Sequence, residues 1–214
     1  MQIQDYIDHT LLKPTATISD IEKLCKEAID HKFYAVCVNG SYAILAKRQL
    51  QGSKVKLAVV IGFPLGAMST ESKVFEAQDG IAHGANEIDM VINVGWMKSG
   101  KFNLVQQEIS KINKAIGEKV LKVIIETCYL TKEEKIKACE LALDAGADFV
   151  KTSTGFGTGG ATLKDVKLMK DVVGSKAKIK ASGGIKDRAT ALKYIALGVS
   201  RIGTSSGIII ASTE

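Results

Sequence analysis

The chain has 214 residues, of which 46% are hydrophobic and 24% charged, so it can bury a sizeable core as one domain, expected to span residues 1–214. Its net charge of +6 comes mostly from lysines dispersed along predicted helix faces, a pattern that favours a small anionic ligand and argues against nucleic acid. Because no apolar run is long enough to span a bilayer and the first residues lack a signal region, we expect a cytoplasmic protein without membrane contacts.

Short apolar runs alternate with amphipathic stretches from one end of the chain to the other. Strands are predicted to begin near Tyr6, Tyr34, Lys56, Glu87, Leu121, Asp148, Ala177 and Ser200. The stretches between them carry helix start signals, with capping boxes at Ser19–Glu22 and Thr131–Glu134 and a further helix after Thr162. Glycines that end helices and lead into strands are predicted at Gly84, Gly146 and Gly198.

The repeated strand–helix unit predicts the fold class. Eight strands at this spacing favour an α/β protein built as a single (β/α)8 TIM barrel with a short N-terminal segment. No Asn-Gly or Asp-Gly turn joins two strand-like runs, which argues against an antiparallel sheet. An open doubly wound sheet is the alternative that the sequence leaves.

Two lysines lie at the ends of neighbouring predicted strands. Lys151 ends the sixth strand and Lys180 lies near the end of the seventh, and barrel enzymes place their active groups at these carboxyl ends. Adjacent strands lie about 5 Å apart, so two inward ammonium groups would disfavour double protonation. One amine would then be uncharged near neutral pH, as a nucleophile that attacks a carbonyl requires. A lone lysine is more often a surface group, but this pair lies inside strand-like segments.

Carboxylates also lie within or just after the predicted strands. Asp89, among strand-forming residues, is either a buried ion-pair partner of a lysine or part of a proton relay. Asp8 and Glu126 are secondary candidates of the same kind, and Glu126 can alternatively pair with Lys122 or Lys180. Two further polar candidates at strand ends are Thr10 and Cys37.

Glycine-rich loops follow the last two strands. Ser182-Gly183-Gly184 follows the seventh and Gly203-Thr204-Ser205-Ser206-Gly207 the eighth, where barrels commonly bind phosphate through backbone N–H groups. The segment 155–160 matches the dinucleotide motif G-x-G-x-x-G, but lysines stand about 20 residues later, where the motif requires an acidic residue. We therefore interpret this segment as a loop that borders the substrate, not as an NAD site.

The sequence contains neither metal-ligand spacing nor the nucleophile elbow of a serine hydrolase. The four cysteines and three histidines are scattered, which is typical of reduced thiols and structural histidines in a cytosolic protein. We expect no metal and no organic cofactor.

Taken together, the strand-end segments resemble those of the deoxyribose-phosphate aldolases, a class I, lysine-dependent aldolase family. The resemblance extends from Asp8 to Gly207 and is strongest in segments 8–14, 62–66, 87–91, 122–127, 146–155, 180–184 and 203–206. It implies a (β/α)8 barrel that reversibly cleaves 2-deoxy-D-ribose 5-phosphate into D-glyceraldehyde 3-phosphate and acetaldehyde, without metal or cofactor. It also implies a homodimer in the cytoplasm.

The resemblance also implies a role for each matching residue. Lys151 would form the Schiff base, Lys180 would perturb its pKa, and Asp89 with Lys180 would transfer protons. The phosphate would be held by Thr154, Gly155, Gly183, Gly184, Ser205 and Ser206. Some family members end in a tyrosine that reaches the active site. Because this sequence ends at Glu214 without one, we expect the relay to depend on Asp89, Lys180 and water.

Two other functions stay open at this stage. An isomerase on a phosphate-binding barrel would keep the glycine-rich loops but use a carboxylate base in place of the lysine nucleophile. A nucleic-acid-binding module would use the positive charge of the surface.

Overall fold

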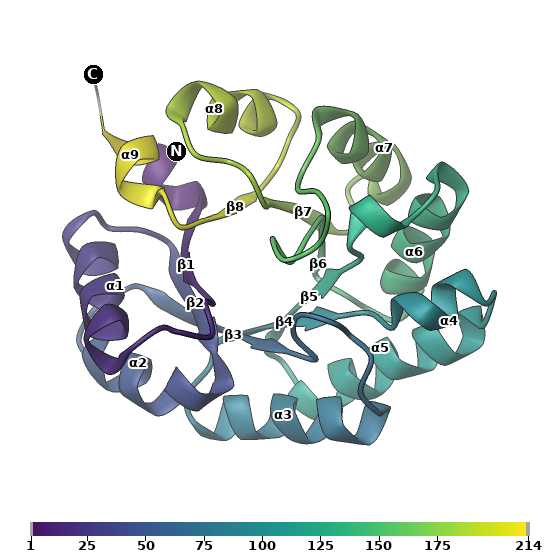
Figure 1. Cartoon of the computed structure of the whole chain (residues 1–214), viewed down its shortest axis with the longest axis horizontal. Coiled ribbons are helices and arrows are strands. Elements are labelled where there is room, and N and C mark those ends of the chain that lie inside the picture. The colour runs from purple at the N-terminus through teal and green to yellow at the C-terminus, as the bar shows by residue number, and fades with distance from the viewer. Residues whose placement is uncertain (1, 213–214) are drawn as a thin grey trace.

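The computed structural model describes residues 2–212, so Thr213 and Glu214 at the end of the sequence lie outside the described residues. Eight parallel strands pair in chain order, and β8 closes the barrel by pairing with β1 through Ile7 and Ile202 (Figure 1). The strands are β1 (Ile7–Leu11), β2 (Ala35–Asn39), β3 (Lys56–Ile61), β4 (Glu87–Val91), β5 (Val120–Ile124), β6 (Phe149–Lys151), β7 (Lys178–Ser182) and β8 (Arg201–Thr204). The predicted closed barrel is therefore confirmed, and the open sheet is wrong.

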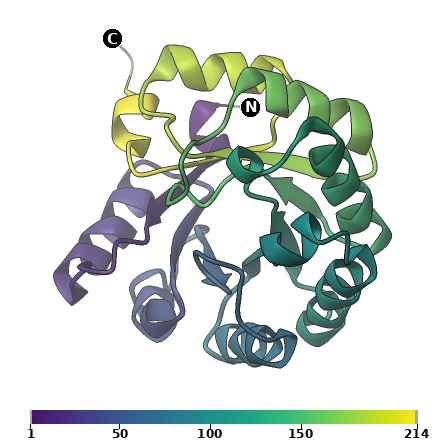
Figure 2. The same cartoon turned by 45° about the vertical axis from the view of Figure 1, so that its right-hand side comes forward.

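Helices surround this barrel on the outside, as both views of the ribbon show (Figures 1 and 2). The α-helices are α1 (Ile18–Asp30), α2 (Ala43–Gln49), α3 (Thr70–Ala82), α4 (Val94–Lys98), α5 (Phe102–Ile116), α6 (Lys132–Asp144), α7 (Leu163–Val173), α8 (Arg188–Ala196) and α9 (Gly207–Ala211). The 3-10 helices are η1 (Ile3–Tyr6), η2 (Gly40–Tyr42) and η3 (Thr127–Tyr129). The predicted short N-terminal segment corresponds to η1, which contacts α9 near the other end of the chain.

Local sequence explains most of the helix boundaries. Thr131 and Glu134 form the predicted capping box of α6, and the Thr162 hydroxyl accepts the N–H of Asp165 at the start of α7. The box predicted at Ser19 and Glu22 is wrong: α1 starts two residues earlier, with Thr17 and Asp20 as the reciprocal pair. Threonine and aspartate at the same spacing satisfy the same backbone donors, which the prediction overlooked.

The three predicted helix-ending glycines have left-handed backbones, with φ of 97° at Gly84, 80° at Gly146 and 86° at Gly198. Only glycine adopts this conformation without a steric cost, so the chain turns sharply there and enters the next strand.

The main apolar core lies between the strands and the surrounding helices. It contains alternate strand residues, such as Val36, Val59, Ile88 and Val123, packed against the inner faces of the helices. The interior of the barrel differs, because charged side chains occupy much of the space that branched apolar residues usually fill. A small apolar group remains inside the barrel, formed by Leu12, Cys37, Ala58, Val60 and Phe63.

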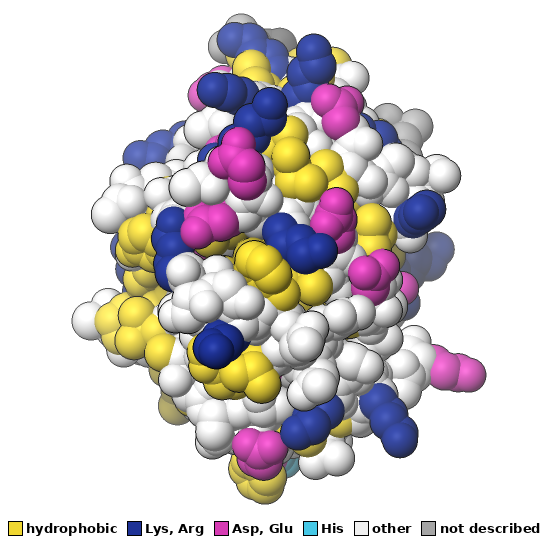
Figure 3. Space-filling view, turned by 90° about the vertical axis from the view of Figure 1, so that its right-hand side faces the viewer, with side chains coloured by type: hydrophobic (Ala, Val, Ile, Leu, Met, Phe, Trp, Pro, Cys, Tyr) yellow, Lys and Arg dark blue, Asp and Glu magenta, His cyan; other side chains and the backbone are white. Residues whose placement is uncertain are grey.

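Charge on the molecular surface is mixed where Figure 3 shows it. The face on the right-hand side of Figure 1, formed by helices that include α4 and α6, shows lysine and arginine side chains interspersed with acidic and apolar ones. On this face the positive charge forms no continuous stripe of the kind that follows a phosphate backbone. Among residues 2–212, no helix is both long and apolar enough to cross a membrane.

Candidate active site

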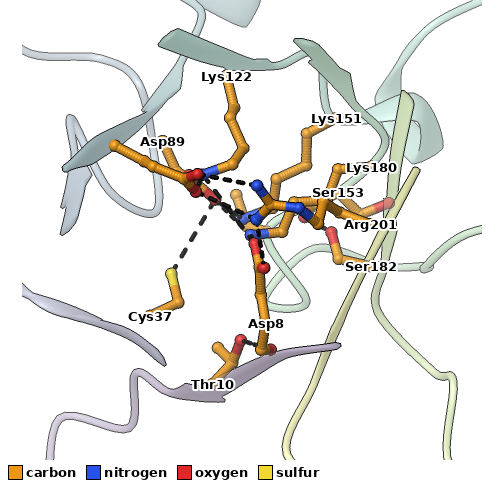
Figure 4. A network of polar contacts seen from close by, with 12 residues as sticks. Asp8, Thr10, Cys37, Asp89, Lys122, Lys151, Ser153, Lys180, Ser182 and Arg201 are labelled. Atoms are coloured by element: carbon orange, nitrogen blue, oxygen red, sulfur yellow. Dashed lines mark hydrogen bonds and ion pairs between the residues drawn. The ribbon is translucent and has the colours of Figure 1, made fainter. Parts of the chain in front are cut away.

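Seven ionisable side chains converge inside the barrel, and all are buried: Asp8, Glu87, Asp89, Lys122, Lys151, Lys180 and Arg201. The strand register brings them together, because Lys151 pairs with Lys180 across β6 and β7, and Lys180 pairs with Arg201 across β7 and β8. In the same way Asp89 on β4 pairs with Lys122 on β5. We call these seven residues the interior charge cluster (Figure 4 labels six of them).

Asp89 is the centre of the cluster, since three lysines point toward its carboxylate (Figure 4). Its Oδ2 atom lies 2.8 Å from both Lys151 Nζ and Lys180 Nζ, and its Oδ1 atom lies 2.6 Å from Lys122 Nζ. Although burial by itself raises the pKa of this carboxyl, the Lys122, Lys151 and Lys180 ammonium groups hold it well below its usual range. Asp89 is therefore a carboxylate in the resting protein.

Lys180 has a second carboxylate partner. Its Nζ lies 2.5 Å from Asp8 Oδ2 as well as near Asp89. Burial opposes the charged form, but the Asp8 and Asp89 carboxylates together raise the pKa of Lys180 above its ordinary value. Burial likewise disfavours the charged form of Asp8, yet Lys180 and Arg201 lower the pKa of Asp8 to about 2. Lys180 and Asp8 therefore stay charged.

Lys151 shows the opposite behaviour. Among the described residues its only ion-pair partner is Asp89, and burial lowers its pKa below the ordinary lysine value. The Asp89 carboxylate raises the pKa and the Lys180 ammonium lowers it further. Desolvation is the first cause of the lowered pKa, because the barrel excludes water from the amine.

The numbers of acidic and basic groups in the cluster agree with the lowered pKa of Lys151. The cluster contains three carboxylates and four bases, and the pKa of each of its two most buried lysines, Lys122 and Lys180, is raised. Arg201 bonds to Asp8 at 2.7 Å and to Glu87 at 2.8 Å, and a guanidinium does not lose its proton. The cluster therefore has one base more than it has acidic groups, which agrees with the lowered pKa of Lys151.

A cavity of about 350 Å³ lies at the carboxyl ends of the strands, and Lys151 is part of its lining. Of the other predicted residues, those that line it are Thr10, Thr154, Gly155, Gly183, Gly184 and Ser205. Lys180 and Asp89 lie beneath the cavity in the charge cluster. A larger cavity of about 880 Å³ lies near the start of β6 and β7, where it is far from Lys151 along the strands and adjoins residues such as Glu140 and Lys176.

Besides Asp8, Asp89 and Lys180 of the interior charge cluster, three predicted residues lie outside the lining of the 350 Å³ cavity. Cys37 is buried with its sulfur 4.0 Å from Asp89 Oδ2, and burial raises the pKa of its thiol. Ser206 follows the lining residue Ser205 and donates its N–H to the Thr204 hydroxyl at 2.9 Å. Glu126 lines a smaller cavity of about 190 Å³ that lies beside the first.

Glu126 bonds to Thr154 and not to a lysine. Its carboxylate accepts the backbone N–H of Thr154 at 3.2 Å and also the Thr154 hydroxyl. Burial raises the pKa of Glu126, although the Thr154 donors oppose this shift. The expected alternative pairing with Lys122 or Lys180 is wrong, because both lysines point toward the carboxylates of Asp8, Glu87 and Asp89.

Several residues of the site were not assigned to it from sequence. The sequence predicts Lys122 only as a partner for Glu126 and does not single out Glu87 or Arg201, although each is a charge inside a strand-like run. Lys13 and Lys186 line the 350 Å³ cavity beside the glycine-rich loops, and they give its outer part a positive charge. Their position in the sequence could have indicated this, because each lysine follows a strand end within a few residues.

Within residues 2–212, no three histidine, cysteine or acidic residues are arranged to hold a metal ion. The polar groups of the cavity are instead amines, hydroxyls and backbone amides, which suit a carbonyl compound with an anionic end.

Comparison with known proteins agrees with this geometry. Residues 3–210 match the family described as DeoC/LacD family aldolase. The chain belongs to the DeoC/LacD aldolase family. This aldolase is 60% identical over 214 residues to a deoxyribose-phosphate aldolase of Thermococcus gammatolerans, covering 98% of this chain and 95% of the relative. It is therefore a carbon–carbon lyase.

Solved structures of aldolases share the barrel of this family member. An aldolase designated QR15 superposes with a TM-score of 0.95 at 45% identity, covering 99% of this aldolase and 95% of that chain. A deoxyribose phosphate aldolase from Aeropyrum pernix, described as having a unique tetrameric structure, gives a TM-score of 0.91 at 34% identity, covering 98% and 89%. That tetramer is a property of the Aeropyrum protein. The homodimer expected for this aldolase stays a prediction.

Proposed function

We propose that this aldolase reversibly cleaves 2-deoxy-D-ribose 5-phosphate into D-glyceraldehyde 3-phosphate and acetaldehyde, with Lys151 as the Schiff-base residue. The observation that carries the proposal is the contrast between two paired lysines. The pKa of Lys151 is lowered while that of Lys180 is raised, and Lys151 is the one that lines the cavity. An amine with a lowered pKa at a cavity wall, beside a lysine that keeps its charge, is the arrangement that imine formation requires.

The proposed reaction begins with attack of the Lys151 amine on the aldehyde carbon of the open-chain sugar. The resulting carbinolamine loses water to give an iminium ion, which draws electrons from the neighbouring carbon–carbon bond. The C3 hydroxyl loses its proton as the C2–C3 bond breaks, so glyceraldehyde 3-phosphate leaves and an enamine stays on Lys151. Protonation of the enamine carbon followed by hydrolysis releases acetaldehyde and restores the amine.

Lys180 and Asp89 are the proposed proton-transfer groups. Asp89 Oδ2 contacts the Nζ atoms of both Lys151 and Lys180. A proton can therefore pass among the three groups with little movement of heavy atoms. Because the Lys180 ammonium and the Asp89 carboxylate are charged before substrate arrives, they also stabilise charges that develop as the carbinolamine forms and collapses. The relay proposed here consists of Lys180, Asp89 and water.

The phosphate is proposed to bind at the outer end of the cavity. Gly183 and Gly184 have left-handed backbones, with φ of 87° and 82°, and they line the cavity together with Gly155 and Ser205. Consecutive left-handed glycines let backbone N–H groups approach a ligand closely. Lys13 and Lys186 add positive charge at the same end, so a phosphorylated sugar fits better than a neutral one.

The decisive experiment traps the intermediate. Acetaldehyde and borohydride are added to the purified protein, and peptide mass spectrometry then locates the ethyl group that reduction leaves on nitrogen. We expect the modification on Lys151 and its loss in Lys151→Leu, together with loss of deoxysugar phosphate cleavage. A Lys151→Leu variant that still cleaves the substrate would favour a lysine-independent reaction such as that of an isomerase-like barrel. Lys178→Leu is the matched control, since Lys178 is exposed on the neighbouring strand.

A further inference from the structure

We propose that Glu126 and Thr154 are positioning residues, which hold Phe156 at the mouth of the barrel as a partition between the cavity at Lys151 and the smaller cavity beside it. Phe156 belongs to the segment that joins β6 to α7, and this segment extends over the barrel opening toward its centre in Figure 1. Because the larger cavity is the proposed reaction site, this assignment depends on the function proposed above.

A directed chain of hydrogen bonds links the three residues. The backbone N–H of Phe156 donates to the Thr154 hydroxyl oxygen at 3.0 Å, and the same hydroxyl donates its proton to Glu126. The backbone N–H of Thr154 also donates to both carboxylate oxygens of Glu126, at 3.2 and 3.3 Å. One buried carboxylate therefore fixes the backbone at the start of the segment.

In this arrangement the Thr154 hydroxyl has no further proton to donate. A threonine hydroxyl has one proton, and Glu126 already accepts it. A phosphate oxygen, which only accepts hydrogen bonds, would have to displace Glu126 to receive that proton. The geometry therefore suits Thr154 as a link between Glu126 and the segment, with its effect on substrate transmitted through Phe156.

The ring of Phe156 lies between two cavities. It lines both the 350 Å³ cavity and the 190 Å³ cavity, and it meets the ring of Phe63 edge to face at a centroid distance of 5.3 Å. Phe63 packs on the apolar wall inside the barrel, which includes Leu12 and Val60. The two rings thus connect the segment after β6 with the segment after β3 across the cavity mouth. Phe156 is 48% exposed, so burial in the core does not explain its position.

The rest of the segment is rich in glycine and packs closely against neighbouring backbone and side-chain atoms. A Cβ atom on Gly157 would lie 2.8 Å from the sulfur of Cys128, and one on Gly160 would lie 2.2 Å from the carbonyl oxygen of Gly183. Close packing on both sides requires glycine, but glycine also leaves the backbone intrinsically free to move. A side-chain tether at Thr154 is therefore needed to keep one conformation.

The backbone conformation of Glu126 also indicates that the link to Thr154 is imposed by the surrounding structure. Its φ of 53° lies in the left-handed region, which is unfavourable for a residue with a side chain. Such strain persists where the surrounding structure imposes it, commonly at functional sites. Here it turns the carboxylate at the end of β5 toward Thr154 on the neighbouring strand end.

The test compares Thr154→Val, which breaks the link, with Thr154→Ser, which retains the hydroxyl. Glu126→Gln is examined beside them. The matched control is Glu134→Gln, because Glu134 also accepts a threonine N–H, from Thr131 at 2.7 Å, but does not line the cavity. Each variant is assayed with 2-deoxy-D-ribose 5-phosphate, and the alkylation rate of Cys128 is followed by mass spectrometry. Cys128 is half-buried under the segment, while Cys25, Cys37 and Cys139 are buried.

We expect Thr154→Val to raise KM about tenfold with a smaller change in kcat. It should also speed alkylation of Cys128 about fivefold, because the segment opens more often. Thr154→Ser and Glu134→Gln should behave as the unaltered protein does. Thr154→Val retains the Glu126 carboxyl group, which accepts the Cys128 thiol, whereas Glu126→Gln alters that contact directly.

Two results would overturn the proposal. In the first, Thr154→Val leaves both KM and the alkylation rate of Cys128 unchanged. In the second, kcat falls with KM unchanged, which would assign the link to the chemical step. Trapping of acetaldehyde on Lys151 in the unaltered protein separates this outcome from failure of the proposed function, since it does not depend on the segment. If trapping fails, the alkylation rates still decide whether Thr154 tethers the segment.

Discussion

Lys151 and Lys180 are register partners on β6 and β7, both 2.8 Å from one oxygen of Asp89, yet their pKa values shift in opposite directions. The difference comes from Asp8, which contacts Lys180 but not Lys151. With two carboxylates Lys180 keeps its proton in spite of burial, whereas Lys151 has one carboxylate that it shares with two other ammonium groups. The two lysines are equivalent in strand register, and their different carboxylate partners give them different roles.

Removing the charge of Lys180 should raise the pKa of Lys151, because the Lys180 ammonium lowers it. We expect Lys180→Leu to reduce kcat/KM at neutral pH by about 100-fold or more, since less of Lys151 is neutral and a proton-transfer group is lost. The pH dependence of borohydride trapping measures the change, and its rise should move to higher pH. Lys178→Leu is the control on the same strand. An unmoved profile would contradict the assigned electrostatic role.

Asp8 should contribute to stability above acidic pH. Its pKa is about 2 in the folded protein against an ordinary value of 3.8. The unfolded chain therefore binds the proton first as pH falls, and stability is lost between about pH 4 and 2. The loss attributable to Asp8 is roughly 2 kcal/mol. Urea unfolding across this range measures it, and a decline in Asp8→Asn as steep as that of the unaltered protein would contradict the prediction.

Lys122 should be needed for folding because two carboxylates depend on it. Its Nζ lies 2.6 Å from both Glu87 Oε2 and Asp89 Oδ1, with no exposure to solvent. Lys122→Met leaves buried negative charge uncompensated, and we expect a loss of about 3–5 kcal/mol in the free energy of unfolding. Lys98→Met removes an exposed ion pair with Glu134 and should cost less than about 1 kcal/mol. Equal losses in denaturant unfolding would refute the distinction.

Lys186 should contribute to binding of the phosphate and not to the chemical step. It lines the outer part of the cavity next to Gly183 and Gly184. We expect Lys186→Ala to raise KM for the phosphorylated sugar about tenfold, since a charged hydrogen bond is lost, while leaving acetaldehyde trapping on Lys151 unchanged. Kinetics with 2-deoxy-D-ribose, which lacks the phosphate, provide the comparison. Similar effects on both sugars would argue against a phosphate contact.

Much of the barrel was predictable because it depends on local pattern. Each strand begins within one residue of its predicted start, since apolar runs and helix caps are read over a few neighbouring positions. Lys151, Lys180 and Asp89 could also be chosen as candidates, as each is a charge inside a strand-forming run. The helix start at Thr17 was missed because two overlapping threonine and serine caps compete within three residues.

Contacts between distant residues were decided only by the tertiary structure. Sequence alone determined that the two lysines would lie on adjacent strands, since strand order follows chain order in a barrel. Only Lys151 ends its strand, whereas Lys180 lies in the middle of β7. The sequence did not determine that Arg201 and Glu87, 114 positions apart, would meet beneath them, or that Glu126 would turn to Thr154. Barrel closure and register set these distances, and both arise from the packing of the whole chain. The pKa of Lys151 depends on those distances and on burial, so only the fold decides which of the two lysines has the lowered pKa.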